Sequence, residues 1–203
     1  MTRSQKAPPR HSGSFRKCVS LLTFLHQVYW LVSKMIILKE NKLLKIPVEL
    51  REEKIEIQGG EIEVFVGENP SLDLEVILSG AGASLNLQGV FLGKDNRGQD
   101  IKLLVIQRAP KTVCRINFRA ALDDSSFSTF DGLVRMEREA EDSVGVLSYK
   151  ALLLSSGARS HPTPKLEVLT KKVASASHAA SVGRIDEGQL FYLQSKGIDL
   201  ATA

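Results

Sequence analysis

The sequence has few cysteines and lacks the motifs of common nucleotide-binding and hydrolytic sites. Its two cysteines, Cys18 and Cys114, are too few for a disulfide framework or a cage of metal-binding thiolates, and they fit a reducing cytoplasm. The absence of a G-x-x-x-x-G-K-[ST] segment excludes ATP binding through a P-loop. No G-x-S-x-G segment is present either, so the nucleophile elbow of the α/β-hydrolases is missing. We expect a cytoplasmic protein without these catalytic sites.

Two pairs of neighbouring acidic residues remain as candidates for acid–base chemistry. Asp123-Asp124 and Asp186-Glu187 could serve as the paired carboxylates of a polysaccharide lyase or hydrolase. Both pairs lie in predicted turns, where acidic side chains are usually solvated, and Asp186 has a second use as a helix cap. We therefore predict that the protein is not an enzyme.

Acidic residues are absent from residues 1–34. The six basic residues there are Arg3, Lys6, Arg10, Arg16, Lys17 and Lys34. The whole chain has 27 basic and 23 acidic residues, so acids slightly outnumber bases in the remainder. A nucleic-acid partner would require a basic face on the folded body. We expect no nucleic-acid binding.

The same 34 residues are unlike the rest of the chain. Residues 1–16 have the composition of a disordered segment, and residues 18–33 form an apolar run that is too short for a membrane span. No A-x-A cleavage site follows. We interpret residues 1–34 as a basic and apolar extension that is disordered or not native, with Met35 as the natural start. An organelle transit peptide and an interfacial amphipathic helix are the alternatives.

The pattern from residue 54 to residue 184 predicts strands. Apolar residues alternate with polar ones in short runs that restart roughly every ten residues, with Gly59-Gly60 and Gly80-Ala81-Gly82 as breaks. This pattern is typical of an all-β domain of many short strands. It does not separate a two-sheet sandwich from a parallel β-helix. Residues 35–53 are expected to be a lead-in to this core.

Residues 185–203 predict one short helix and a tail. Asp186 is the expected N-cap, with Gln189 completing a capping box. Gly197 occupies the position of a left-handed C′ residue, and Ile198 can make the contact of a Schellman ending. Leu190, Phe191 and Leu193 form a narrow apolar face, which we expect to close the end of the core, with Phe191-Tyr192 packed on its last coil.

The stretch from Leu166 to Ile198 resembles the end of the core domain of the SufB/SufD family, the scaffold proteins of SUF iron–sulfur cluster assembly. The family reads P-x-LEI, then SHGATVGR, then QLFYLRSRGI. The matching residues are Pro164 with Leu166-Glu167-Val168, Ser177 to Arg184, and Gln189 to Leu193, and upstream Phe130-Asp131-Gly132 and Leu152 to Ala158 match F-x-G and LLLS-x-x-A. The histidine segment, and the lack of the cysteine-bearing strand of SufB, favour a SufD-like member.

The resemblance implies a right-handed parallel β-helix (a β-solenoid) with a short C-terminal capping helix. It also implies a role for His178, which matches the histidine proposed to place a nascent cluster at the interface with SufB. We predict His178 as a ligand of iron or of the cluster, or as a proton carrier, at a subunit interface. The alternative is a histidine that orients the turn before the helix. His161 is expected to face solvent from a polar loop.

Thiolates, the usual cluster ligands, are missing from the positions that the resemblance highlights. The essential SufB cysteine corresponds to Tyr149, and the cysteine that often lies two places before the histidine in SufD-like proteins corresponds to Ala176. Cys114 lies on the same face of its predicted strand as Ile116 and Phe118, so we predict that it is buried. We expect no cofactor bound by this chain alone, and a transient iron–sulfur cluster shared with a partner.

Family members carry helices before and after the core, and the later ones dock the ATPase SufC. This chain stops at Ala203, so we interpret it as truncated at both ends and do not expect SufC to dock in the usual way. Lys171-Lys172-Val173 replaces the family's D-D-V. The prediction is a non-catalytic scaffold subunit that pairs with a SufB-like subunit or with itself, without membrane contact. The alternative is a β-solenoid interaction module without cluster-assembly activity.

Overall fold

The structure is a computed structural model that describes residues 35–68 and 70–199. The chain divides into Met1–Lys34 and Met35–Ala203, and the description here concerns the second unit. The predictions made for residues 1–34, including Cys18, lie outside the described residues. No helix in the described part is long and apolar enough to cross a membrane.

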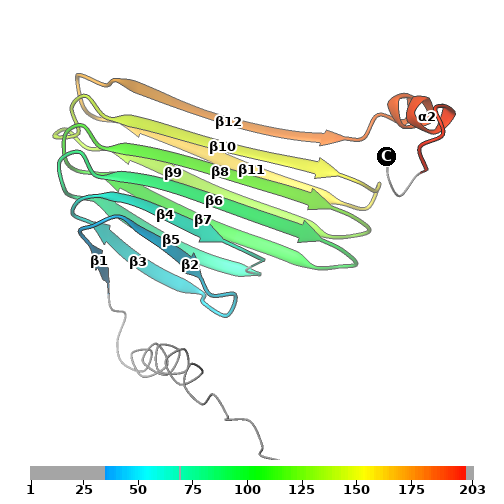
Figure 1. Ribbon diagram of the computed structural model, residues 1–203, viewed down its shortest axis with the longest axis horizontal. Coiled ribbons are helices and arrows are strands. Elements are labelled where there is room, and N and C mark those ends of the chain that lie inside the picture. Colours follow the sequence, from blue (N-terminus) through cyan, green and yellow to red (C-terminus); the bar gives the residue numbers. More distant parts are fainter. Residues whose placement is uncertain (1–34, 69, 200–203) are drawn as a thin grey trace, which may run out of the picture. The chain divides into compact units, whose positions relative to one another are not determined.

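Two parallel sheets make up the core, with strands that alternate between them (Figure 1). Sheet A contains, in spatial order, β1 (Ile36–Leu38), β3 (Glu52–Ile57), β5 (Ser71–Leu78), β7 (Gly98–Gln107), β9 (Phe127–Met136) and β11 (Arg159–Val168). Sheet B contains β2 (Lys42–Ile46), β4 (Glu61–Val66), β6 (Ser84–Gly93), β8 (Val113–Leu122), β10 (Val144–Leu153) and β12 (Ser175–Arg184). Because each strand pairs with the strand two places further along the chain, the chain winds as a solenoid. The predicted parallel β-solenoid is confirmed.

The alternation of apolar and polar residues explains both sheets. In β4 and β6 every second side chain is buried between the sheets, and those between them face outward. Strands begin earlier than the alternation indicated, because β1, β2 and the start of β3 occupy the segment expected to be a lead-in. The strands lengthen from three residues in β1 to ten in β6 and every later strand.

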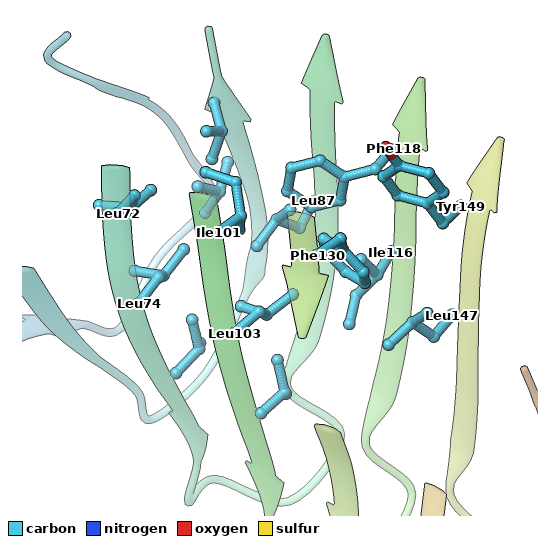
Figure 2. Close-up of a cluster of buried hydrophobic side chains, with 14 of the residues drawn as sticks. Leu72, Leu74, Leu87, Ile101, Leu103, Ile116, Phe118, Phe130, Leu147 and Tyr149 are labelled. Carbon is cyan, nitrogen blue, oxygen red and sulfur yellow. The ribbon is translucent and has the colours of Figure 1, made fainter. Parts of the chain in front are cut away.

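The interior between the sheets is one cluster of buried apolar side chains, part of which Figure 2 shows. Near the C-terminal coils it contains three aromatic rings. The ring centroids of Phe118 and Phe130 are 4.8 Å apart, and those of Phe130 and Tyr149 are 5.2 Å apart and stacked. Such pairs add about 0.5–1.5 kcal/mol each beyond the effect of burial. This cluster supports the coil that carries the candidate site.

Candidate functional site

The last coil, formed by β11 and β12, is the exposed end of the solenoid. β11 is the edge strand of sheet A and β12 the edge strand of sheet B (Figure 1). No residue of either strand is buried, whereas every second residue of β10 is buried. Among the described residues, no further coil covers this end.

His178 lies on β12 in register with Leu147 of β10, a residue that is 1% exposed. Residues in register on neighbouring parallel strands point the same way, so the imidazole continues an inward-facing column. It is nevertheless exposed, because nothing described stacks above it. The histidine is therefore presented by the open end and not enclosed within the column.

The imidazole is held by one hydrogen bond across the coil. His178 Nδ1 lies 2.9 Å from the carbonyl oxygen of Pro164 on β11. A carbonyl oxygen only accepts, so Nδ1 carries the proton and the lone pair lies on Nε2. Metal-binding histidines commonly have this arrangement, with one nitrogen donating to a carbonyl and the other free to bind. Sequence reasoning missed Pro164, although it belongs to the matched P-x-LEI segment.

Among the described residues, His178 has no neighbouring set of ligands. Within residues 35–68 and 70–199, no group of three or more histidine, cysteine, aspartate or glutamate side chains is placed to hold a metal ion. A single imidazole supplies one ligand, whereas iron–sulfur clusters are usually held by four. Any cluster at this end would therefore need further ligands from elsewhere.

His161 faces solvent, as predicted, but the expected polar loop is wrong. The residue lies within strand β11, which also contains Pro162 and Pro164. Proline is tolerated at a sheet edge because its missing N–H can face away from the neighbouring strand. The segment that was expected to be a loop is instead part of an edge strand.

Two ion pairs attach β11 to the preceding coil on the outer face of sheet A. Lys165 Nζ lies 2.7 Å from Asp131 Oδ1, and Arg135 Nε lies 2.6 Å from Glu167 Oε2. Hydrogen bonding to Glu167, and its charge, raise the pKa of Arg135. All four side chains are partly exposed, so solvent and salt weaken both pairs. They link β9 to β11, the strand whose Pro164 carbonyl accepts from His178.

Helix α2 (Glu187–Ser195) has the predicted ends. The Gln189 N–H donates to Asp186 Oδ1 at 2.8 Å, which is the first of the two hydrogen bonds of a capping box. Gly197 has a φ of 87°, and the N–H groups of Gly197 and Ile198 donate to the carbonyls of Gln194 and Leu193. These are the two hydrogen bonds of a Schellman ending.

The expected packing of α2 on the last coil is wrong. None of its residues is buried, and Phe191 and Tyr192 are 72% and 60% exposed. The helix follows the end of β12 (Figure 1). Its aromatic side chains are exposed to solvent. Further exposed apolar residues lie in or beside the last coil: Val168, Leu169, Val173, Val182 and Ile185. Exposed apolar surface gathered in one region is typical of a protein interface.

The acidic pairs have structural roles. Asp123 and Asp124 lie in the turn between β8 and β9, where Asp123 Oδ1 accepts from the Asp124 N–H and Asp124 Oδ2 accepts from the Asp95 N–H. Asp186 is the N-cap of α2. Each pair therefore stabilises a turn or a helix end.

Comparison with known proteins identifies the family. Residues 55–203 match the family model described as "SUF system FeS cluster assembly, SufBD core domain". The chain belongs to the SufBD core family. Membership confirms the resemblance seen in the sequence.

Individual relatives agree with this. The chain is 32% identical over 133 residues to an iron–sulfur cluster assembly SufBD family protein of Mycobacterium tuberculosis (61% of this chain, 33% of the relative). It is 31% identical over 121 residues to SufD of Bacillus subtilis (60% and 28%), and 26% identical over 186 residues to SufB of the same organism (92% and 37%). The chain thus spans about a third of the length of these SufBD proteins.

Packing explains why a glycine follows the phenylalanine in the matched segment Phe130-Asp131-Gly132 of this SufBD core. A Cβ added at Gly132 would lie 2.5 Å from the Phe130 ring, two residues earlier on the same face. Glycine therefore leaves the space that the ring occupies. Phe130 is in turn stacked on Tyr149, at the position where SufB has its essential cysteine by the resemblance.

Tyr149 fills the core and holds the last coil. It is 2% exposed, and its hydroxyl donates to Ser128 Oγ at 2.9 Å and lies 2.9 Å from Ser160 Oγ on β11. Ala176 lies on β12 in register with Gly145. Neither position places a thiol near His178 in this member of the SufBD family.

Cys114, the one cysteine among the described residues, is buried as predicted. Burial raises the pKa of its thiol to about 12, a change that the nearby Arg115 opposes. The thiolate is the form that binds metals and attacks reagents, so this sulfur is chemically inert at neutral pH. It packs within the apolar core.

We predict that Cys114 is protected from thiol reagents until the protein unfolds. In a Cys18→Ser variant, the rise of the thiol pKa from 9.0 to about 12 lowers the thiolate fraction by roughly a thousandfold. Labelling by an aromatic disulfide reagent should be at least that much slower in buffer than in denaturant. Rapid labelling in buffer would contradict the burial of this side chain.

Proposed function

We propose that this chain is a SufD-like scaffold subunit without catalytic activity, acting in the cytoplasm. It helps to hold or transfer a nascent iron–sulfur cluster at an interface with a SufB-like subunit or with a second copy. Membership of the SufBD family supports the role in cluster assembly. The matched histidine segment supports the SufD-like assignment.

The observation that carries the proposal is the presentation of His178. The exposed imidazole has its Nδ1 proton held by the Pro164 carbonyl, which leaves Nε2 as a neutral ligand or proton acceptor. Neutral imidazole is a suitable ligand for iron and adds no charge. We infer that His178 binds iron or the cluster, or carries a proton, at the seam between two subunits.

Other ligands of the cluster, which is the cargo of the reaction, come from the partner or from sulfide. The single cysteine of the described part is buried, with a pKa of about 12. A SufB-like subunit that covers the last coil would bring its own thiolates toward His178. It would also cover the apolar residues Val182 and Ile185, which are each 42% exposed.

A second candidate function is a β-solenoid interaction module without cluster-assembly activity. The buried Tyr149 at the position of the SufB cysteine favours it, because a cluster site has been replaced there by core packing. On this view His178 only links β12 to β11. The two functions differ in whether iron is retained.

Anaerobic reconstitution tests the proposal. The full chain is incubated with iron and sulfide, with and without a SufB-like partner, and the visible absorption of the cluster is recorded. We expect a chromophore in the presence of the partner that loses most of its intensity in His178→Ala. His161→Ala is the matched control, because His161 is an exposed histidine on the outward face of the same coil. If iron is retained in neither condition, or equally in both variants, the scaffold role is refuted.

A further inference from the structure

Acidic residues are absent from three neighbouring strands of sheet B. β6, β8 and β10 lie side by side in that sheet and contain no aspartate or glutamate (Figure 1). In sheet A, by contrast, β3, β5, β7, β9 and β11 each contain at least one. The basic residues of the three strands are Arg115, Arg119 and Lys150, which are exposed and lie between buried neighbours. They therefore face outward and give this part of sheet B a positively charged surface.

These positive charges are not neutralised within the described part of the chain. None of the three forms an ion pair with a described residue, whereas three ion pairs lie on the outer face of sheet A. Arg119 is held by neutral groups, since its Nη1 donates to the Phe118 carbonyl at 2.8 Å and to Ser148 Oγ at 3.4 Å. Lys150 lies in register with Arg119 on the next strand. Like charges side by side repel each other, so an anionic group from outside would stabilise this pair.

An apolar row lies beside the basic pair on the same face. Leu92, Ala121 and Leu152 are in register across β6, β8 and β10, and we call them the leucine row. Leu92 is 54% exposed and Leu152 is 42% exposed, with the smaller Ala121 between them. The row lies two residues beyond Arg119 and Lys150, a distance of about 7 Å along the strands. Exposed apolar side chains next to unpaired charges are typical of a surface that binds a partner.

We propose that the outer face of β6, β8 and β10 binds an amphipathic α-helix of a partner protein, with apolar side chains on the leucine row and acidic side chains on the basic residues. One turn of a helix rises about 5.4 Å, close to the spacing of about 4.8 Å between strands. Successive turns of a helix that lies across the strands would therefore each meet one strand. The leucine row gives contacts that a nucleic-acid backbone would not use, and it lies in a flat sheet and not at a loop tip that could enter a membrane.

Binding of a synthetic peptide to the full chain tests the inference. The peptide is stapled as a helix, with leucines on one face and glutamates on the neighbouring face, and fluorescence anisotropy measures its dissociation constant. We expect Lys150→Glu to raise this constant about tenfold, because it places an acid opposite the glutamates. Arg159→Glu is the matched control, since it makes the same charge change at an exposed position of sheet A, and it should leave the constant unchanged. Circular dichroism verifies that both variants are folded.

The apolar contact has its own pair of variants. Leu152→Ala should raise the dissociation constant about fivefold through lost apolar burial, whereas Phe127→Ala removes an equally exposed side chain from the outer face of sheet A and should not. A second peptide has lysines in place of the glutamates and should not bind.

Several results would overturn the inference. They are no binding of the glutamate peptide up to about 1 mM, equal binding of both peptides, or equal effects of the sheet B variants and their sheet A controls. Binding of anionic phospholipid vesicles or of an oligonucleotide, but not of the glutamate peptide, would also refute it. The surface lies apart from the coil of His178, so His178→Ala should leave peptide binding intact. Peptide binding and the His178-dependent chromophore can therefore each fail without the other.

Discussion

Phe130→Ala is expected to lower the free energy of unfolding by about 3–5 kcal/mol. Phe130 is 1% exposed and lies between Phe118 and Tyr149, so its removal leaves a cavity bordered by two rings. Neighbouring coils cannot collapse into this space without breaking parallel hydrogen bonds. The loss should also loosen the Tyr149 hydroxyl, which links Ser128 to Ser160 of the last coil.

Phe127→Ala is the matched control for this prediction. Phe127 lies on the same strand, but its side chain is 45% exposed, so its removal leaves no closed cavity. We expect it to cost less than about 1.5 kcal/mol. Chemical denaturation followed by far-ultraviolet circular dichroism measures both variants. Equal losses for the two would show that Phe130 is not the centre of the core cluster.

Gly80→Ala is expected to destabilise the protein by about 3 kcal/mol, the upper end of the usual cost of overpacking, because the added methyl group meets backbone and not a movable side chain. A Cβ at Gly80 would lie 1.8 Å from the carbonyl oxygen of Gln58 and 2.3 Å from its carbon. The approach is fixed by the N–H groups of Ser79 and Gly80, which both donate to the Ile57 carbonyl. The two coils would have to separate to admit one methyl group.

Alanine substitutions at two other glycines distinguish a steric clash from backbone strain as the cause of a loss of stability. Gly82 has a φ of 72° and open space around its Cβ position, so Gly82→Ala should cost about 1 kcal/mol from backbone strain alone. Gly183 has neither a positive φ nor a neighbour within 4 Å, so its substitution by alanine should be nearly neutral. Thermal unfolding of the three variants measures the order of their stabilities. A Gly80→Ala variant as stable as Gly183→Ala would refute the close approach of the coils.

Local pattern was enough to predict the strands but not their pairing. Alternation in residues such as Ile62, Val64 and Val66 marks a buried face, and the structure buries all three. Which strands become neighbours depends on contacts between distant residues, such as Val76 with Val105. The spacing of apolar residues along the chain does not indicate which distant residues come into contact. The solenoid was therefore predicted from the family segments and not from periodicity.

The errors at the C-terminal end have physical causes. The apolar face of α2 suggested packing, but a helix buries such a face only where a surface is available, and Phe191 meets none among the described residues. The loop expected around His161 is an edge strand that contains Pro162 and Pro164, because the sequence does not show which N–H groups face an edge. The position of His178 was predictable as a motif. Its bond to Pro164 depends on how β11 and β12 face each other.

The increase in strand length along the chain has a consequence for local opening. β1 and β2 have three and five residues, whereas β11 and β12 each have ten. In a solenoid each coil is stabilised by its immediate neighbours, so the coil with the shortest strands opens at the lowest free energy. Transient fraying and proteolytic nicking should thus concentrate around β1 and β2. The coils that carry His178 would then tolerate partial unfolding at the far end of the column.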